Sequence, residues 1–414
     1  QPFGADTLLL DMRGLDRITG FDAEVGEVEV EAGIMWPALV AGLQALQPDV
    51  VAPWSIIQKQ TGADRLTIGG ALASNVHGRG LAFAPIGQDV AAFSLVDANG
   101  NLRRCSREED ADLFAHAIGG YGLFGVIVSV RLRLQRRYQV ERVVEVVDAA
   151  ALPNRFAERI AEGYAYGDFQ FNIDPGGDDF LRLGVFSCYR PVTDIAPIPG
   201  TQRALTTDDW QRLILLAHID KRAATDRYTA HYLATSGQRY WSDLHQMADY
   251  LDGYHAGIDE KSGARVPGSE MISEIYVPRA DLPDFLAGAA GVIRETGANL
   301  IYGTVRLIEP DRESVLAWAR EPWACSIFNL HVEHSPDGVA RAAAQFRALI
   351  DLGLSFGGSY YPTYQRWATR EQVRDAHPRF IEFLRGKLRH DPDERFQSDW
   401  WRHYRTMFAA ELAG

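Results

Sequence analysis

The stretch Thr61–Gly80, TGADRLTIGGALASNVHGRG, is the one around which the chain is organised. A short β-prone run, Arg65–Ile68, meets the glycine pair Gly69 and Gly70, and small residues follow over Ala71–Ser74. Paired glycines let backbone amides approach a bound anion where a Cβ would collide. We interpret the stretch as a cradle for a phosphate-bearing cofactor with a large planar head. The alternative is a tight turn between packed elements.

Four segments in a fixed order give this stretch its context. They are LLLDMRGLDRI (Leu8–Ile18), EVEAGIMWPALVAGL (Glu29–Leu43), LTIGGALASNVHG (Leu66–Gly78) and DLFAHAIGGYGLFGVIVSVRLRL (Asp112–Leu134). In this order they resemble the flavin-binding domain of the vanillyl-alcohol oxidase / p-cresol methylhydroxylase (PCMH-type) superfamily, over most of the first 137 residues. Within it the chain is most similar to the sugar and aldonolactone oxidases and the decaprenylphosphoryl-ribose oxidases. The resemblance implies FAD as the cofactor.

The resemblance also implies which residues lie at the cofactor. The segment around His77 lies beside the flavin ring, where His77 is either a packing residue or a proton-transfer group. The Gly119–Gly122 segment touches ribose and pyrophosphate, and the backbone of the following strand reads the adenine; the alternative for these glycines is a strained helix-to-strand turn. The expected cofactor residues are Thr67, Ile68, Gly69, Gly70, Ser74, Asn75, Val76, His77, Gly78, Gly119, Gly120, Gly122, Ile127 and Tyr361.

The chain begins at Gln1-Pro2-Phe3-Gly4, which the resemblance places in mid-domain. In the family the preceding segment carries a glycine-rich loop that wraps the flavin pyrophosphate and often ends in a histidine bonded to the flavin. Either the sequence is a fragment, which we favour, or the protein does without this loop, and we expect FAD held without a covalent bond on this chain.

Composition excludes several classes of function. A net charge of −13 argues against a nucleic-acid partner, because such proteins carry basic patches. The three cysteines, Cys105, Cys188 and Cys325, are odd in number and widely spaced, which gives neither a disulfide framework nor a metal signature. The sequence contains no run of about 18 apolar residues, so we expect no transmembrane helix. We expect a cytoplasmic protein that binds no metal.

The order of predicted elements indicates an α+β chain in three parts. Alternation predicts strands at Leu8–Leu10, Glu27–Glu31 and Val90–Asp97, and Pro37 favours a helix running to Leu46. Residues 1–137 form the expected FAD-binding domain. Residues 138–360 form an α+β substrate (cap) domain with an antiparallel sheet flanked by helices. Residues 361–414 form a C-terminal segment that, by resemblance, returns to the flavin domain.

The cap contains a largely helical region, Thr206–Asp252, with Thr206 or Thr207 as a plausible N-cap. This region and its immediate end are rich in aromatic and histidine residues, which we interpret as packing or as the wall of a substrate cleft, without the spacing of metal ligands. They are Tyr228, His231, Tyr232, Tyr240, Trp241, His245, Tyr250, Tyr254 and His255.

Flavin oxidation of an alcohol needs a hydride path to the flavin N5 and a base, or polar groups, for the hydroxyl proton. By resemblance, Glu274 and Arg306 stand on neighbouring cap strands, where they bind sugar hydroxyls and tune a base or form an ordinary ion pair. His331 is either a buried structural histidine or a further catalytic group. Tyr361 matches a flavin-contacting aromatic residue, and Tyr364 stands where the family has a lysine near flavin N1.

These observations predict an FAD-dependent oxidoreductase that oxidises a CH–OH group of a sugar, aldonolactone or polyol, with dioxygen or an unknown carrier as electron acceptor. Glu274, Arg306, Tyr364 and His331 are the expected catalytic residues. An un-ionised tyrosine donates only a neutral hydrogen bond where the family's lysine supplies charge, although Arg366 could supply it. Two alternatives therefore stay open, an FAD-dependent 2-hydroxy-acid dehydrogenase and a non-catalytic protein with a flavin fold.

Overall fold

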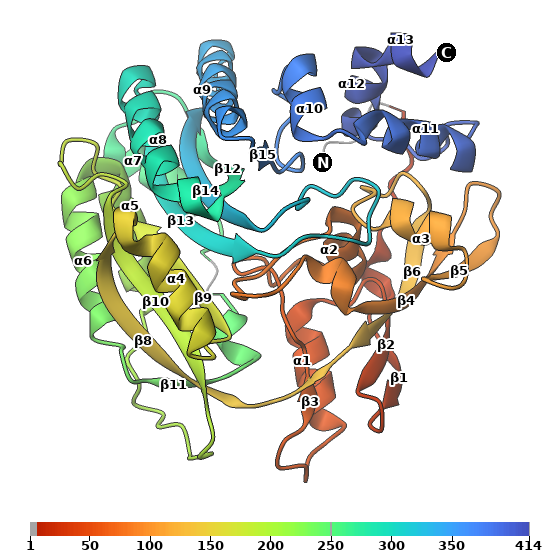
Figure 1. Ribbon diagram of the computed structural model, residues 1–414, viewed down its shortest axis with the longest axis horizontal. Helices are drawn as coiled ribbons and strands as arrows, with labels where there is room; N and C mark the ends of the chain where they lie inside the picture. The colour runs from red at the N-terminus through yellow and green to blue at the C-terminus, as the bar shows by residue number, and fades with distance from the viewer. Residues whose placement is uncertain (1–5, 249–250, 414) are drawn as a thin grey trace.

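The computed structural model describes residues 6–248 and 251–413. Its two main sheets are antiparallel throughout: a small one of order β1-β2-β6-β4-β5 and a large one of order β11-β8-β10-β9-β13-β14-β12-β15. Figure 1 shows them side by side, the large sheet on the left and the small one on the right. Gln1–Gly4 and Tyr250 lie outside the described residues.

The small sheet is built from the first third of the chain. Its strands are β1 (Ile18–Asp22), β2 (Glu27–Glu31), β4 (Val90–Val96), β5 (Leu102–Ser106) and β6 (Val126–Arg133), accompanied by helices α1 (Trp36–Ala45), α2 (Ile68–Ser74) and α3 (Ala111–Ala117). The predicted strand at Leu8–Leu10 is wrong: these residues are exposed and irregular, and a 3₁₀ turn at Met12–Gly14 follows them. The β-prone run Arg65–Ile68 is also not a strand. The Thr67 side chain caps α2, so helix begins at Ile68.

The large sheet carries helices on both faces. Its strands are β8 (Gln139–Asp148), β9 (Tyr166–Phe171), β10 (Leu183–Val192), β11 (Arg239–Trp241), β12 (Gly268–Pro278), β13 (Leu300–Ile308), β14 (Trp323–Glu333) and β15 (Ser359–Tyr360). One face packs against α4 (Leu152–Ala161), α8 (Leu282–Thr296) and α9 (Pro336–Ser355); α5 (Thr207–Ile219), α6 (Lys221–Leu233) and α7 (Tyr254–Ser262) lie on the other side. The predicted antiparallel sheet with flanking helices is therefore observed.

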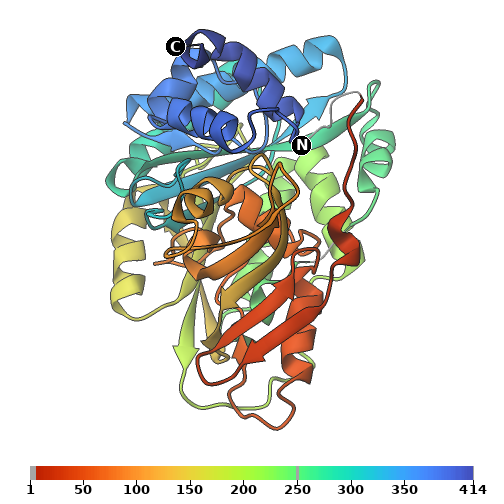
Figure 2. The same ribbon diagram turned by 90° about the vertical axis from the view of Figure 1, so that its right-hand side faces the viewer.

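The C-terminal helices return to the small sheet. They are α10 (Arg370–Ala376), α11 (Phe380–His390), α12 (Asp399–Met407) and α13 (Ala409–Leu412), and Figure 2 shows them above the first third of the chain. Phe383 of α11 packs against Phe124 with ring centroids 5.2 Å apart. Arg395 donates to the carbonyl of Ala98 at 3.0 Å. The domain boundaries at residues 137 and 360 remain a prediction; the short pair β3 (Trp54–Ser55) and β7 (Gln135–Arg136) lies at the first of them.

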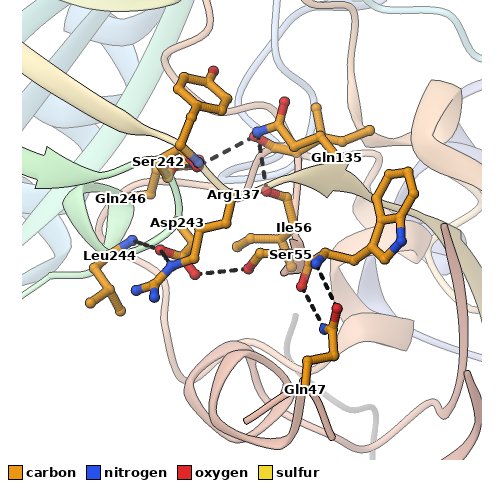
Figure 3. A network of polar contacts seen from close by, with 12 residues as sticks. Gln47, Ser55, Ile56, Gln135, Arg137, Ser242, Asp243, Leu244 and Gln246 are labelled. Atoms are coloured by element: carbon orange, nitrogen blue, oxygen red, sulfur yellow. Dashed lines mark hydrogen bonds and ion pairs between the residues drawn. The ribbon is translucent and has the colours of Figure 1, made fainter. Parts of the chain in front are cut away.

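A buried polar network joins the segment around Ser55 to the turn at Asp243 (Figure 3). Asp243 is fully buried and accepts hydrogen bonds from Ser55 Oγ at 2.8 Å, from Arg137 Nε at 2.9 Å and from the amide of Leu244 at 2.8 Å. Gln246 accepts from the amide of Lys59 at 3.0 Å. Because Ser55, Arg137 and Asp243 come from three separate parts of the chain, the network fixes the position of the segment that leads into Thr61–Gly80.

We predict that Asp243→Ala lowers the free energy of unfolding by about 3–5 kcal/mol, because it leaves Arg137 as an uncompensated, nearly buried charge. Urea unfolding followed by circular dichroism measures the change. Asp194→Ala is the matched control, since Asp194 pairs with Arg239 at the surface; it should leave the unfolding midpoint unchanged. Equal midpoints for Asp243→Ala and the unmodified chain would contradict the role given to this network.

Candidate functional site

The carboxylate of Glu274 on β12 is the centre of the candidate site. The residue is 2% exposed and accepts hydrogen bonds from three different segments. His77 Nε2 lies 2.9 Å from Oε2, Tyr276 OH donates to Oε2 at 2.8 Å, and Tyr364 OH donates to Oε1 at 2.8 Å. The thiol of Cys325 lies 3.8 Å from Oε2. Sequence positions as far apart as 77, 274 and 364 thus meet at one carboxylate.

These contacts decide the protonation of the site. Burial alone raises the pKa of a carboxyl group, but the charge of His77 and the hydrogen bonds from His77, Tyr364 and Tyr276 outweigh it and hold the pKa of Glu274 below its usual range. Burial, together with the Glu274 charge, raises the pKa of both Tyr276 and Tyr364 well above the ordinary value for tyrosine. The site therefore holds an ionised carboxylate between neutral phenol donors.

His77 faces an acceptor on each side of its ring. Nδ1 lies 3.0 Å from the carbonyl oxygen of Gly78, and Nε2 faces Glu274. A neutral imidazole carries one proton, whereas the imidazolium carries two and satisfies both acceptors. The geometry therefore favours an imidazolium–carboxylate pair, buried on both sides. The ring of Trp318 packs beside His77 at 5.4 Å between centroids and stacks on Tyr276 at 5.0 Å.

The turn that delivers His77 depends on Asn75. This residue ends α2 in the left-handed region, with φ 46°, a conformation that asparagine tolerates better than most residues. Its side-chain amide donates to Asp311 at 2.8 Å, and its side-chain oxygen accepts from the amide of Gly87 at 3.0 Å. Trp318 Nε1 donates to its carbonyl at 3.2 Å. These bonds hold the backbone that orients His77.

The predicted ion pair between Glu274 and Arg306 does not form among the described residues. The expectation that their strands are neighbours is wrong, because β14 lies between β12 and β13. Register separates them further: Glu274 is level with Ile327 and Thr304, whereas Arg306 is level with Cys325 and Tyr276, one row further along. All of these side chains share the sheet face that Glu274 occupies, because alternate residues of a strand point to the same side. Arg306 is 6% exposed and its Nε has no hydrogen-bond partner. It is a buried cation with spare donor capacity beside the carboxylate.

His331 lies away from Glu274. It stands near the end of β14, four residues beyond Ile327, which at about 3.3 Å per residue separates the two by about 13 Å along the sheet. Its Nδ1 contacts Glu270 at 3.4 Å. The structure thus brings Glu274 and Tyr364 together with His77, places Arg306 one row away, and leaves His331 outside this group.

Two of the predicted cofactor segments lie side by side. The amide of Gly119 donates to Leu72 at 3.0 Å, and the amide of Tyr121 donates to Ala73 at 2.8 Å. Gly122 has φ +72°, and no atom lies within 4 Å of the position that its Cβ would take. The open backbone at Gly122 is compatible with a cofactor that lies along this segment. Gly120 is closed instead, because a Cβ there would stand 2.4 Å from the His116 carbonyl oxygen.

The glycine pair of the opening stretch is enclosed by protein. A Cβ on Gly69 would stand 2.9 Å from that of Ala32, and the amides of Ile68 and Gly69 donate to Ile34 and Ala32. The amide of Gly70 donates to the Thr67 hydroxyl at 3.1 Å. These amides are therefore already paired, as the alternative of a turn between packed elements requires. The phosphate contact expected for the pair remains a prediction.

The other expected cofactor residues have these positions. Tyr361 donates through its hydroxyl to the Ser74 carbonyl at 2.5 Å, and its amide donates to the Glu274 carbonyl at 3.1 Å. Val76 is buried in the core, and Ile127 lies in β6 opposite Leu95. A Cβ on Gly78 would stand 2.7 Å from the Lys59 carbonyl oxygen. Tyr361 therefore links the sheet to the end of α2.

Sequence reasoning missed three contributors to the site. Tyr276 stands two residues after Glu274, so strand alternation could have placed both on one face. Gln60 donates to the Tyr364 hydroxyl at 3.2 Å, and Trp318 covers His77. Both lie outside helices and strands, where no periodic pattern predicts a contact across the chain.

A buried carboxyl group stands beneath the loop that follows His77. Asp89 is 6% exposed and accepts a hydrogen bond from Gln58 Nε2 at 3.0 Å. Burial raises the pKa of Asp89 to about 7, against the partial opposition of the glutamine contacts. The folded protein therefore prefers this carboxyl group protonated.

Comparison with known proteins gives independent evidence on the family. A family model described as an FAD binding domain matches residues 2–106. L-gulono-1,4-lactone dehydrogenase of Mycobacterium tuberculosis is 24% identical over 400 residues, which cover 96% of this chain and 86% of that protein. Decaprenylphosphoryl-beta-D-ribose oxidase of Mycolicibacterium smegmatis is 22% identical over 409 residues, covering 97% and 85%. L-gulonolactone oxidase of Bos taurus is 27% identical over 136 residues, covering 33% and 29%.

These matches confirm the resemblance to PCMH-type FAD oxidoreductases. They support an FAD-linked oxidoreductase activity with FAD as the cofactor. In the part of the chain that the structure describes, no helix has the length and apolar character needed to span a membrane.

We predict that Asp89→Asn stabilises the protein at pH 8 by about 1–3 kcal/mol and has little effect below pH 4. The pKa of Asp89 is higher in the folded than in the unfolded protein. Its contribution to the free energy of unfolding is therefore fully present below the unfolded pKa and is lost as the pH rises towards 7. The variant has no such proton to lose. Urea unfolding of both proteins between pH 4 and pH 8 measures the effect, and parallel stability curves would contradict it.

Proposed function

We propose that the protein oxidises the CH–OH group of a sugar, aldonolactone or related polyol, with Glu274 as the residue that receives the hydroxyl proton. The single observation that carries this proposal is the buried, ionised Glu274 carboxylate. Among the residues that the structure describes, Oε2 accepts from His77 and Tyr276, whereas Oε1 accepts only from Tyr364. A carboxylate oxygen has room for two donors, so Oε1 can accept a substrate hydroxyl.

The neighbouring groups suit this role. FAD, when bound, supplies the hydride acceptor. The open backbone at Gly122 would hold it on this chain, and Asn75 and His77, whose polar groups are bonded within the protein, would shape the surface beside it. The His77 imidazolium balances the carboxylate charge, and the free Nε of Arg306 would donate to a second oxygen of the substrate. Sugars and lactones offer such neighbouring oxygens.

Tyr364 gives this site a different charge from the lysine of the family. Its hydroxyl donates to Glu274 and accepts from Gln60. A phenol that stays protonated holds the carboxylate in place without adding positive charge. We infer that Tyr364 acts by orienting Glu274, and that the positive charge of the site comes from His77 and Arg306.

A second candidate function follows from the unused hydrogen-bond donor of Arg306. A guanidinium group with unused donors suits a carboxylate, so a 2-hydroxy acid is an alternative substrate. The names of the relatives favour lactones or a phosphoryl-linked sugar over a free acid. A non-catalytic protein is the remaining alternative, and the next measurement separates all three.

We predict that the purified chain shows a two-band flavin absorption spectrum. Acid precipitation should release the flavin into solution, because the cofactor is not covalently bound. Anaerobic addition of L-gulono-1,4-lactone or sorbitol should bleach the visible bands, whereas lactate should not. Bleaching by lactate alone would favour the hydroxy-acid alternative. A flavin spectrum that no donor bleaches would favour a non-catalytic protein.

We further predict that Glu274→Gln slows flavin reduction by a factor on the order of 100 or more, because an amide accepts a proton far less readily than a carboxylate. Stopped-flow absorbance under anaerobic conditions measures this rate. Glu309→Gln is the matched control, since Glu309 pairs with Arg279 outside the site, and it should reduce at the unmodified rate. A Glu274→Gln variant that binds FAD and reduces within twofold of the unmodified chain would exclude Glu274 as the base.

A further inference from the structure

A second buried carboxylate, Glu270, stands four residues before Glu274 on the same face of β12. Three histidines surround it. His218 Nε2 lies 3.1 Å from Oε1, His331 Nδ1 lies 3.4 Å from the same oxygen, and His255 Nδ1 lies 2.9 Å from Oε2. These residues come from α5, β14 and α7, so the cluster joins two helices to the sheet.

The contact between His218 and Glu270 is close but is not a hydrogen bond. The His218 side chain is 5% exposed, and its Nε2 is buried without a hydrogen-bond partner. The nitrogen forms an ion pair with Glu270 but no well-aligned hydrogen bond, and a buried polar atom in that position needs an explanation. The lone pair of a neutral imidazole is what a metal ion binds.

The spacing of the three atoms suits a metal ion. One ligand atom from each of His218, Glu270 and His331 lies within 4.8 Å of the other two. Zinc binds imidazole nitrogen and carboxylate oxygen at about 2.0–2.2 Å in tetrahedral sites, which places neighbouring ligand atoms about 3.4 Å apart. The two nitrogen–oxygen separations here, 3.1 and 3.4 Å, are close to that value.

We propose that His218, Glu270 and His331 bind a divalent transition-metal ion of the zinc type. Two imidazoles and one carboxylate form a donor set that suits zinc and similar ions and is unsuited to calcium or magnesium. Sequence spacing gave no sign of this site, because positions 218, 270 and 331 meet only through sheet register and helix packing.

The surroundings of Glu270 support the proposal. Tyr254 OH donates to Oε2 at 2.5 Å, and His255 contacts the same oxygen. This leaves Oε1 for the metal, and such outer partners are what usually orient a ligand carboxylate. The His218 and His331 rings stand edge to face, with centroids 4.9 Å apart. Both rings can therefore present a nitrogen to one point.

The site borders a large cavity between α5, α6 and the sheet. The cavity has a volume of about 530 Å³ and an apolar wall that includes Leu213, Ile214 and Ala217 of α5. Glu270 and Asn329 form part of its polar lining, and the side-chain oxygen of Asn329 is buried without a partner. A metal with three protein ligands keeps a fourth position. Bound here, the ion would fix α5 over the cavity.

A second histidine cluster at Asp112, His116 and His390 has a weaker claim. His116 Nδ1 lies 2.7 Å from the Asp112 carbonyl oxygen and is committed to it, and the Asp112 side chain is 64% exposed. We therefore place the metal at Glu270. The proposal is independent of FAD and of the proposed oxidation.

The test is metal binding by the full chain after removal of metals with a chelator. Zinc chloride titrated against a chromophoric zinc chelator should give one equivalent of bound zinc per chain. His218→Ala and His331→Ala should each raise the Kd at least on the order of 100-fold, because each removes a ligand. His218→Gln and His331→Gln repeat the test with larger side chains, and circular dichroism reports whether each variant is folded.

His334→Ala is the matched control. His334 stands three residues after His331, and its Nε2 contacts the Ser269 hydroxyl at 2.8 Å instead of Glu270. It should bind zinc as the unmodified chain does. The proposal is overturned if the unmodified chain binds no stoichiometric zinc, if folded His218 and His331 variants bind it equally well, or if His334→Ala weakens binding as much as they do.

Discussion

The buried negative charge of Glu274 is the constraint on which the rest of the structure depends. Taking a carboxylate out of water costs several kcal/mol unless hydrogen bonds and a counter-charge replace the lost solvent. Here His77, Tyr276 and Tyr364 supply them, one from the first third of the chain, one from the same strand and one from the C-terminal segment. The small sheet, the large sheet and the final helices must therefore all be in place before this charge is compensated.

Much of the fold follows from local sequence pattern. Alternation gives the strand Glu27–Glu31, Thr206 caps α5, and the helix that Pro37 favours forms as α1, from Trp36 to Ala45. The errors have local causes. Leu8–Leu10 is apolar but has no partner strand, and Thr67 caps a helix where β propensity favours a strand. The residue pattern of one segment does not reveal whether another strand lies beside it to pair with.

The candidate site is predictable only in part, for reasons of register and loop packing. Family resemblance identifies Glu274, but its partner depends on which strand pairs with β12, and that strand is β14, which separates Glu274 from Arg306 on β13. The glycine pair Gly69 and Gly70 has the composition of a phosphate cradle, yet its amides are satisfied by protein. Glycine composition shows that a backbone could approach a phosphate, but tertiary packing decides whether its amides are free to bind one.

Glu270 and Glu274 show how one strand supports two different kinds of site. Both are nearly buried and share a sheet face, about 13 Å apart. Around Glu274 the oxygens face phenol donors and a histidine with two acceptors, so each donor there has a partner and the carboxylate is fixed in its charged form. Around Glu270 the donors are mostly imidazoles, and one buried nitrogen is left without a hydrogen bond. A complete set of donors holds a carboxylate at a fixed position towards a substrate hydroxyl, whereas imidazole nitrogens gathered without a full set of hydrogen bonds suit a cation. The identity of the neighbours, more than the carboxylate itself, gives each end of the strand its chemistry.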